Sequence, residues 1–206
     1  MKRALISDFG GVLTSPLQEG FLAYQQESGV SLEDFGRAMA RASEELGESP
    51  LFVLERGEIS ERDFFARIEP HLDDGFDVAR FRTVQFERMR ANRSMIEFVR
   101  EVRGRGRRTA LLTNNVREWA PLWRAKLPEI DELFEVVVDS AFVGMRKPDP
   151  AIYELTVERL GVAAEECVFV DDLEPNCETA RRLGMSVVRF EHAEQAIPEL
   201  RSAFAD

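Results

Sequence analysis

The sequence predicts an α/β fold, a Rossmann-like, doubly wound parallel sheet that carries an inserted block of helices. From residue 93 onward, short apolar runs alternate with stretches of helical periodicity, which is typical of a parallel sheet built from βα units. An earlier apolar run at residues 4–6 is separated from them by residues 15–92, where only helical periodicity is found. We therefore expect a core domain of residues 1–14 and 93–206 and a helical domain of residues 15–92.

Composition places the chain among soluble globular proteins. Hydrophobic residues make up 44% and charged residues 32% of its 206 residues, and no apolar run approaches the roughly 20 residues of a membrane span. The net charge of −11 argues against a nucleic-acid partner. Cys167 and Cys177 show no disulfide-framework spacing, and residues 1–3 lead directly into the first strand. We therefore expect a cytoplasmic protein without a membrane partner.

The first predicted strand lies close to the N-terminus. Ala4–Ile6 is the short apolar run required of a strand buried on both faces, and Asp8, Gly10 and Gly11 follow it. A carboxylate at the carboxyl end of a buried strand, followed by a flexible turn, lies where open α/β sheets place their active sites. Taken alone, this pattern suits a turn-capping Asp8 equally well. Three later segments favour a functional site.

The inserted block, residues 15–92, contains no strand candidate. Apolar positions recur at helical spacing over residues 17–28, 32–46, 60–70 and 77–91. Ser31 and Ser60 each precede an acidic first turn, as N-capping residues do. Pro50 and the polar bend at residues 71–75 are expected to separate the helices.

Helices and strands alternate in the second half of the chain. The predicted helices cover residues 94–103, 117–126, 150–160, 175–183 and 193–204. The predicted strands cover residues 109–113, 135–139, 167–171 and 186–190. Strands that alternate with helices of this length indicate one parallel sheet covered by helices on both faces.

Polar residues follow the predicted strands at positions where a buried sheet does not need them. They are Asp8, Thr113–Asn114, Lys147 and Asp171–Asp172. The carboxyl ends of parallel strands lie side by side, so these side chains are expected to converge on one crevice. Each residue alone suits a capping or solvated-loop role. Their recurrence at one edge of the sheet indicates a single site.

The charges of these residues indicate phosphate chemistry. Asp8, Asp171 and Asp172 repel one another when held together, which favours a hard divalent cation such as Mg²⁺. With Lys147 and the hydroxyl–amide pair Thr113–Asn114, the cation would form a clamp for an anionic group such as phosphate. Asp8 is then placed to act as a nucleophile and form an aspartyl-phosphate.

Four motifs in this order resemble those of the haloacid dehalogenase (HAD) superfamily of hydrolases, over essentially the whole chain. They are Asp8–Thr14, Leu111–Asn115, Lys147–Pro150, and Phe169–Asp172 with Asn176 and Ala180–Met185 behind it. The helical block, which includes Gly57–Ser60, resembles the cap inserted after the first strand in one subfamily. Within that subfamily the chain is most similar to phosphatases such as the N-terminal domain of soluble epoxide hydrolase.

The resemblance implies roles at the metal. Asp8 would be the nucleophile and Asp172 a direct magnesium ligand, with Asp171 assisting. Gly10 would contribute its backbone carbonyl, which is the family's ligand at that position.

The resemblance also implies roles around the substrate. Thr113 and Asn114 would hold the phosphoryl oxygens, and Lys147 would stabilise charge on the nucleophile and on the phosphoryl group. The cap would close over the site and select a small phosphorylated substrate.

Gly10 departs from the pattern of the family's phosphatases, which carry a second aspartate two residues after the nucleophile as general acid and base. Loss of such a group slows proton transfer by about 10²–10⁴-fold. Alkyl phosphates should suffer most, and aryl or acyl phosphates least. Glu19 at the start of the cap is a candidate replacement, but a solvated position in the first helical turn is the favoured interpretation.

Three functions are therefore considered. A magnesium-dependent phosphatase is favoured. The alternatives are a catalytically impaired member that binds a phosphorylated ligand or a partner, and a carbon–halogen hydrolase of the haloacid dehalogenase type. The dehalogenases work without a metal, so the pair Asp171–Asp172 would be misplaced there. The sequence assigns neither the substrate nor the oligomeric state.

Several conspicuous residues are interpreted as structural. His71 and His192 are expected at the surface or at helix ends, and Cys177, Trp119 and Trp123 in packing positions. The arginine cluster is expected to be a solvated helix end, and it comprises Arg103, Arg105, Arg107 and Arg108. The aromatic candidates for the cap side of the crevice are Phe21, Tyr24 and Phe52.

Overall fold

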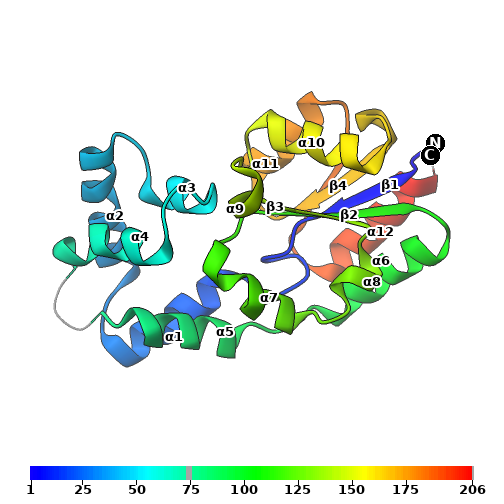
Figure 1. The fold of residues 1–206 in the computed structure, drawn as a ribbon. Helices are drawn as coiled ribbons and strands as arrows, with labels where there is room; N and C mark the ends of the chain where they lie inside the picture. The colour runs from blue at the N-terminus through cyan, green and yellow to red at the C-terminus, as the bar shows by residue number, and fades with distance from the viewer. Residues whose placement is uncertain (73–75, 206) are drawn as a thin grey trace.

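The computed structural model describes residues 1–72 and 76–205 and confirms the predicted α/β fold. Five parallel strands form one sheet in the order β3-β2-β1-β4-β5 (Figure 1). The strands are β1 (Ala4–Ser7), β2 (Arg108–Thr113), β3 (Val136–Asp139), β4 (Cys167–Asp171) and β5 (Ser186–Arg189). The central strand β1 is buried along its whole length, as its apolar sequence requires.

Helices cover both faces of the sheet (Figure 1). One face carries α10 (Pro150–Leu160) and α11 (Glu174–Arg182), and the other carries α6 (Arg93–Gly104), α8 (Ile130–Leu133) and α12 (Ala193–Ala205). Successive side chains of a strand point to opposite faces, so Leu5 and Ile6 belong to two different apolar clusters. The sheet is therefore the middle layer of three, with a core on each side.

The register of β1 places the polar strand ends together. Ser7 pairs with Leu111 of β2 and with Val170 of β4. The backbone N–H of Asp8 donates to the carbonyl of Val170 at 2.9 Å, which extends this pairing by one residue. The residues that follow the three strands therefore emerge at one edge of the sheet, where α/β folds place ligands.

The inserted helices lie beside this carboxyl edge of the sheet (Figure 1). They are α1 (Leu17–Ser28), α2 (Leu32–Leu46), α3 (Pro50–Glu55), α4 (Glu61–Ile68) and α5 (Val78–Arg88). Their shared core is aromatic, and the ring of Phe81 packs edge-on against Phe21 and Tyr24 with centroids 5.7 and 5.4 Å apart. Ser31 and Ser60 form the predicted N-caps, each with a reciprocal capping box.

Two short crossings connect the inserted helices to the sheet. Thr14 and Ala91 form an antiparallel bridge, and the backbone N–H of Ser15 donates to Arg90 at 2.8 Å. Asn92 donates from its backbone to Leu13 at 2.8 Å and from its side chain to Val12 at 3.0 Å. The outgoing and returning segments are thus tied to each other at the base of the block.

The helices of the insert differ from the prediction in three places. Pro50, expected to separate helices, begins α3, because a proline at the first helical position lacks only an N–H that has no partner there. The helix expected at 60–70 ends at Ile68 and continues as a 3₁₀ turn over Glu69–His71, since Pro70 cannot donate to the α-helical pattern. The helix expected at 77–91 ends at Arg88, because residues 89–91 extend toward the bridge with Thr14.

Elsewhere the predicted bounds are close to the observed ones, and short helices account for the differences. The helix expected at 117–126 begins as a 3₁₀ turn, Arg117–Trp119, followed by α7 (Ala120–Lys126). The helices α8 and α9 (Ser140–Val143) were not predicted, because single turns are too short to show periodicity. Of the bend predicted at residues 71–75, residues 73–75 lie outside the described part of the chain.

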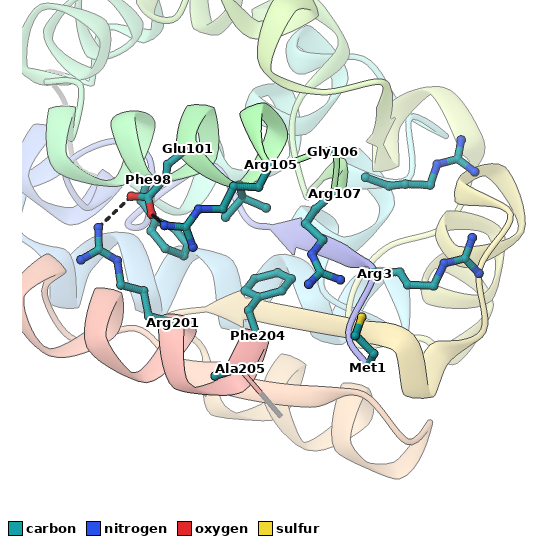
Figure 2. A pocket seen from close by; sticks show the side chains of 12 residues that line it. Met1, Arg3, Phe98, Glu101, Arg105, Gly106, Arg107, Arg201, Phe204 and Ala205 are labelled. Carbon is teal, nitrogen blue, oxygen red and sulfur yellow. Dashed lines mark hydrogen bonds and ion pairs between the residues drawn. The ribbon is translucent and has the colours of Figure 1, made fainter.

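A cavity of about 460 Å³ lies at the other end of β1 from Asp8, and three arginines of the cluster, Arg105, Arg107 and Arg108, line it (Figure 2). Glu101 accepts from Arg105 at 2.6 Å and from Arg201 at 2.7 Å. Arg107 donates to the carbonyl of Lys2 and lies 5.9 Å from the ring centroid of Phe204. Arg105 is exposed as expected, whereas Arg103, Arg107 and Arg108 are partly buried.

Candidate active site

Lys147 joins two carboxylates at the carboxyl edge of the sheet. Its ammonium donates to Asp8 at 2.7 Å and to Asp171 at 2.6 Å, and only 1% of the lysine is exposed. Burial disfavours the ammonium, but the charges of Asp171 and Asp8 outweigh it and raise the pKa of Lys147 above its ordinary value. Lys147 is therefore a fixed cation between the ends of β1 and β4.

Asp8 is held in the same ionic cluster, with a side chain that is 10% exposed. Burial raises its pKa to about 7, and the charges of Asp171 and Asp172 add to this rise. Lys147 opposes the rise through both its charge and its hydrogen bond. A cation beside Asp8 would stabilise the carboxylate further, as a nucleophile requires.

Asp171 is fully occupied by donors within the protein. Its carboxylate accepts from Lys147, from the side-chain amide of Asn176 at 2.9 and 3.1 Å, and from the backbone of Leu173 at 2.9 Å. These bonds compensate the complete burial of the group. Asn176, which belongs to the fourth motif of the sequence, therefore orients Asp171.

Asp172 has a different environment. Asp8, Asp171 and Asp172 each offer an oxygen, and the three atoms lie within 4.8 Å of one another. Within the described ranges, no side chain donates a hydrogen bond to the Asp172 carboxylate, whose pKa is raised by burial and by Asp171. The residues present therefore fit a divalent cation, with the open carboxylate of Asp172 as the group that would gain most from it.

The two glycines after Phe9 differ in the space around them. Gly11 has φ +85°, and a Cβ there would lie 2.5 Å from Oδ2 of Asp172, so only glycine leaves room for that carboxylate. Gly10 faces open space, since a Cβ there would meet nothing closer than Leu17 at 3.7 Å. A Cβ at position 10 would therefore make only ordinary van der Waals contact.

Thr113 and Asn114 lie where predicted, at the end of β2. Thr113 is 2% exposed, and its hydroxyl is only weakly engaged, at 3.4 Å from the carbonyl of Asn114. Asn114 accepts from the backbone N–H of Lys147 at 2.8 Å and donates to its carbonyl at 3.0 Å. The side chain of Asn114 therefore fixes the backbone that carries Lys147.

A cavity of about 200 Å³ extends from Gly10, Thr113 and Asn114 to the inserted helices. Its walls are mostly apolar and include Phe35, Leu51, Phe64, Phe81, Phe86 and Met89. Of the aromatic residues proposed for this wall, Phe21 and Tyr24 are buried in the core of the insert instead, and Phe52 is 40% exposed. Helical periodicity does not distinguish the cavity side of a helix from its core side, which is why the sequence indicated the wrong aromatic residues.

Two further residues of this region lie outside the predicted site. Glu55, at the end of α3, lines the cavity, and its Oε2 accepts from Nε of Arg146 at 2.7 Å. The guanidinium of Arg146 also lies 3.9 Å from the ring centroid of Phe52. The only sequence signal was the position of Arg146 beside Lys147, and no local pattern linked it to Glu55, 91 residues away.

Most of the residues interpreted as structural occupy structural positions, whereas Trp119 and Trp123 also line the cavity. Glu19 pairs with Arg90 at an exposed site, and His71 with Glu45 at 3.3 Å. His192 accepts from the backbone of Gln195 in the first turn of α12. The thiol of Cys177 is buried against the carbonyl of Asp171, and burial raises its pKa to about 12. Trp123 is 1% exposed.

No helix in the described part of the chain is both long enough and apolar enough to cross a bilayer.

Known proteins share this sequence pattern and this fold. Bifunctional epoxide hydrolase 2 of Rattus norvegicus is 24% identical over 96% of this chain, which spans 38% of that protein's length. The sesquiterpene phosphatase astK of Aspergillus oryzae is 28% identical over 97% of this chain and 95% of its own. A HAD family enzyme of Bacteroides thetaiotaomicron, solved in complex with magnesium and inorganic phosphate, superimposes with a TM-score of 0.66 at 21% identity over 91% of this chain and 93% of that one.

A family model for haloacid dehalogenase-like hydrolases matches residues 2–184, which include all the residues of the site. The chain therefore belongs to the haloacid dehalogenase-like hydrolase family.

Proposed function

We propose that the protein is a magnesium-dependent phosphatase that forms an aspartyl-phosphate on Asp8. The observation that carries the proposal is the shared bond of Lys147 to Asp8 and Asp171, with the open carboxylate of Asp172 beside them. A fixed cation next to a buried carboxylate, with a hydroxyl from Thr113 at the same edge, is suited to an anionic phosphoryl group. The phosphatase and the magnesium and phosphate complex among the similar proteins support this choice.

Magnesium would be held by Asp8, by Asp172 and by the backbone carbonyl of Gly10. When bound, it would supply positive charge that neutralises the phosphoryl oxygens and keeps Asp8 ionised. Asp171 would act as a positioning residue, because Lys147, Asn176 and Leu173 occupy its carboxylate. Of the two adjacent aspartates, Asp172 is therefore the direct ligand in this proposal.

The residues of this chain would divide the reaction as follows. The Asp8 carboxylate attacks phosphorus, and the bond to the leaving oxygen breaks. Lys147 stabilises charge on Asp8 and on the phosphoryl group, and the Thr113 hydroxyl holds a phosphoryl oxygen. Asn114 would hold a phosphoryl oxygen beside Thr113, and its side chain also keeps the backbone of Lys147 in place.

The organic part of the substrate is proposed to be apolar. The cavity that opens from Gly10 and Thr113 is walled by aromatic and aliphatic side chains and has a volume of about 200 Å³. A phosphorylated molecule with a small hydrocarbon or aromatic group would bury that group there. Residues 15–92 are proposed to be the cap domain that supplies most of this wall, against a core of residues 1–14 and 93–206.

Two alternatives are less well supported. In a carbon–halogen hydrolase, the open carboxylate of Asp172 would have no role. In a protein that only binds a ligand, a nucleophile held against a buried lysine would have no role. The test is hydrolysis of 4-nitrophenyl phosphate with and without Mg²⁺, in the wild type and in Asp8→Asn. Magnesium-dependent turnover that Asp8→Asn abolishes is expected. Tight magnesium binding without turnover would indicate the binding protein, and metal-independent release of halide from a 2-haloacid would indicate the dehalogenase.

A further inference from the structure

Gly10 leaves the proposed phosphatase without the acid that protonates the leaving group, and the structure offers one replacement. Among the described residues that line the cavity, Glu55 is the only carboxylic acid. It faces the same cavity as Gly10, Thr113 and Asn114 but comes from the inserted helices. We propose that Glu55 is the general acid and base of the reaction and takes over the role of the aspartate that Gly10 lacks. The inference rests on the proposed phosphatase function.

The position of Glu55 is fixed by the sheet domain. Its carboxylate accepts from Arg146 at 2.7 Å, and the side chains of Glu55 and Arg146 are 16% and 17% exposed. Arg146 directly precedes Lys147, whose backbone is held by Asn114. Phe52, on the same helix as Glu55, covers the guanidinium at 3.9 Å. The cap thus brings Glu55 to the loop that carries the catalytic lysine.

A second contact fixes the turn that follows Glu55. Gly57 has φ +68°, and a Cβ there would lie 2.2 Å from the carbonyl of Ala141 in α9. Arg117 donates to that same carbonyl, so its charge is directed at the core backbone. The end of α3 therefore packs closely on the sheet domain, and Glu55 is held beside the site in the described state.

The charges around Glu55 suit proton transfer. Burial raises its pKa above the ordinary value, whereas Arg146 and Lys147 lower it. The neighbouring Arg56 pairs with Glu48 and Glu58 and is not available to Glu55. When burial raises the pKa of a carboxyl group more than its cationic neighbours lower it, the group can exchange a proton nearer neutral pH than a solvated carboxyl group can.

Glu55 alone can transfer the proton in both steps of the reaction. In the first, Asp8 bonds to phosphorus while the phosphorus–oxygen bond to the leaving group breaks, and protonated Glu55 gives its proton to that leaving oxygen. In the second, the Glu55 carboxylate takes a proton from water as the water oxygen attacks phosphorus. Phosphate leaves, Asp8 is restored, and Glu55 is protonated again.

The test compares Glu55→Gln with Glu58→Gln on two substrates, n-hexyl phosphate and 4-nitrophenyl phosphate, in the presence of Mg²⁺. The glutamine amide oxygen can still accept from Arg146, so the substitution removes proton transfer and keeps the contact. Glu58, three residues further on, is exposed and pairs with Arg56, which makes it a matched control.

Glu55→Gln is expected to lower turnover of n-hexyl phosphate by about 10²–10⁴-fold, because its alkoxide must be protonated as it leaves. Nitrophenolate needs no proton. The same variant should therefore release one nitrophenolate per enzyme in a rapid burst, followed by slow turnover as the phosphoenzyme accumulates. Glu58→Gln should match the wild type on both substrates.

An equal loss on both substrates without a burst would overturn the proposal, because it would indicate a structural role for Glu55. Unchanged turnover of n-hexyl phosphate in Glu55→Gln would overturn it as well. Failure of the phosphatase function itself is distinguishable, since the wild type would then show no magnesium-dependent turnover of either substrate.

Discussion

The ammonium of Lys147 donates one hydrogen bond to Asp171 at 2.6 Å and another to Asp8 at 2.7 Å. A buried lysine between two buried carboxylates leaves one net negative charge, before the charge of Asp172 is added. This arrangement binds the ends of β1 and β4 to the loop after α9. It also leaves an excess of negative charge that suits a divalent cation.

Lys147→Met should destabilise the fold as well as abolish turnover. The methionine fills similar volume but leaves Asp8 and Asp171 buried against each other without a cation. Breaking a buried ion pair in this way costs about 3–5 kcal/mol at neutral pH. Urea unfolding at pH 7 measures the loss. A stability equal to that of the wild type at pH 7 would contradict the ionic cluster.

Gly11→Ala should weaken magnesium binding. Its Cβ would lie 2.5 Å from Oδ2 of Asp172 and would displace that carboxylate. Gly29→Ala is the control, because it imposes a similar φ of +80° with nothing within 4 Å, and therefore isolates the backbone strain of about 1 kcal/mol.

Isothermal titration with Mg²⁺ measures the difference between the two variants. At least a tenfold weaker affinity, about 1.4 kcal/mol, is expected for Gly11→Ala alone. Equal magnesium affinity in Gly11→Ala and Gly29→Ala would show that the close approach of Asp172 to Gly11 does not matter for the metal.

Gly10→Asp should raise turnover of alkyl phosphates above that of the wild type, since the nearest atom to a Cβ there is Leu17 at 3.7 Å. The added carboxyl group would supply a second proton donor on the leaving-group side. Steady-state turnover of n-hexyl phosphate relative to 4-nitrophenyl phosphate measures the effect. Gly10→Ala serves as the control for side-chain bulk. An equal ratio of the two turnover rates in Gly10→Asp and Gly10→Ala would contradict proton donation from a carboxyl group at position 10.

Leu51→Asp should weaken the binding of apolar substrates. Leu51 lines the cavity but is already 37% exposed, so the substitution spares the core of the insert. A carboxylate in the apolar wall should lower kcat/KM for n-hexyl phosphate by about tenfold, mainly through KM. Leu22→Asp, at a 44% exposed position of α1 outside the cavity wall, is the control. An unchanged KM would place the organic group elsewhere.

Ionisation of Asp139 should lower the free energy of unfolding as the pH rises. Burial raises its pKa to about 6 from the ordinary value of 3.8, opposed by its hydrogen bond from the backbone of Ala141 and by Arg124. The folded state thus holds the proton more tightly than the unfolded state. Its stabilisation is complete below the ordinary value and is lost as the pH rises through 6, in total on the order of 2–3 kcal/mol.

Asp139→Asn removes this dependence and keeps an oxygen for the N-cap of α9. The difference in unfolding free energy between variant and wild type should therefore shift in favour of the variant between pH 4 and pH 7. Urea unfolding at several pH values measures it. A difference that stays constant over this range would contradict the raised pKa.

The sequence determined the elements that carry the site. The apolar run Ala4–Ile6 predicted the central strand, which Asp8 follows. Thr113 and Asp171 are the last residues of two further strands, and all these bounds were predicted within about one residue. Because parallel strands align their carboxyl ends, strand position alone brought Asp8 and Asp171 to one edge. Gly10 was visible as a missing carboxylate without any structure.

Only the tertiary structure decided how these groups are used. Asp171 and Asp172 are neighbours in sequence, yet one is saturated by Lys147 and Asn176 and the other is open. Glu55 meets Arg146 across 91 residues, a pairing set by the docking of α3 on the core and by no local pattern. Strand periodicity follows from the backbone, whereas hydrogen-bond partners and cavity walls depend on which helix faces meet. For this reason the sequence determined the position of the site, and the fold decided the surroundings of each group.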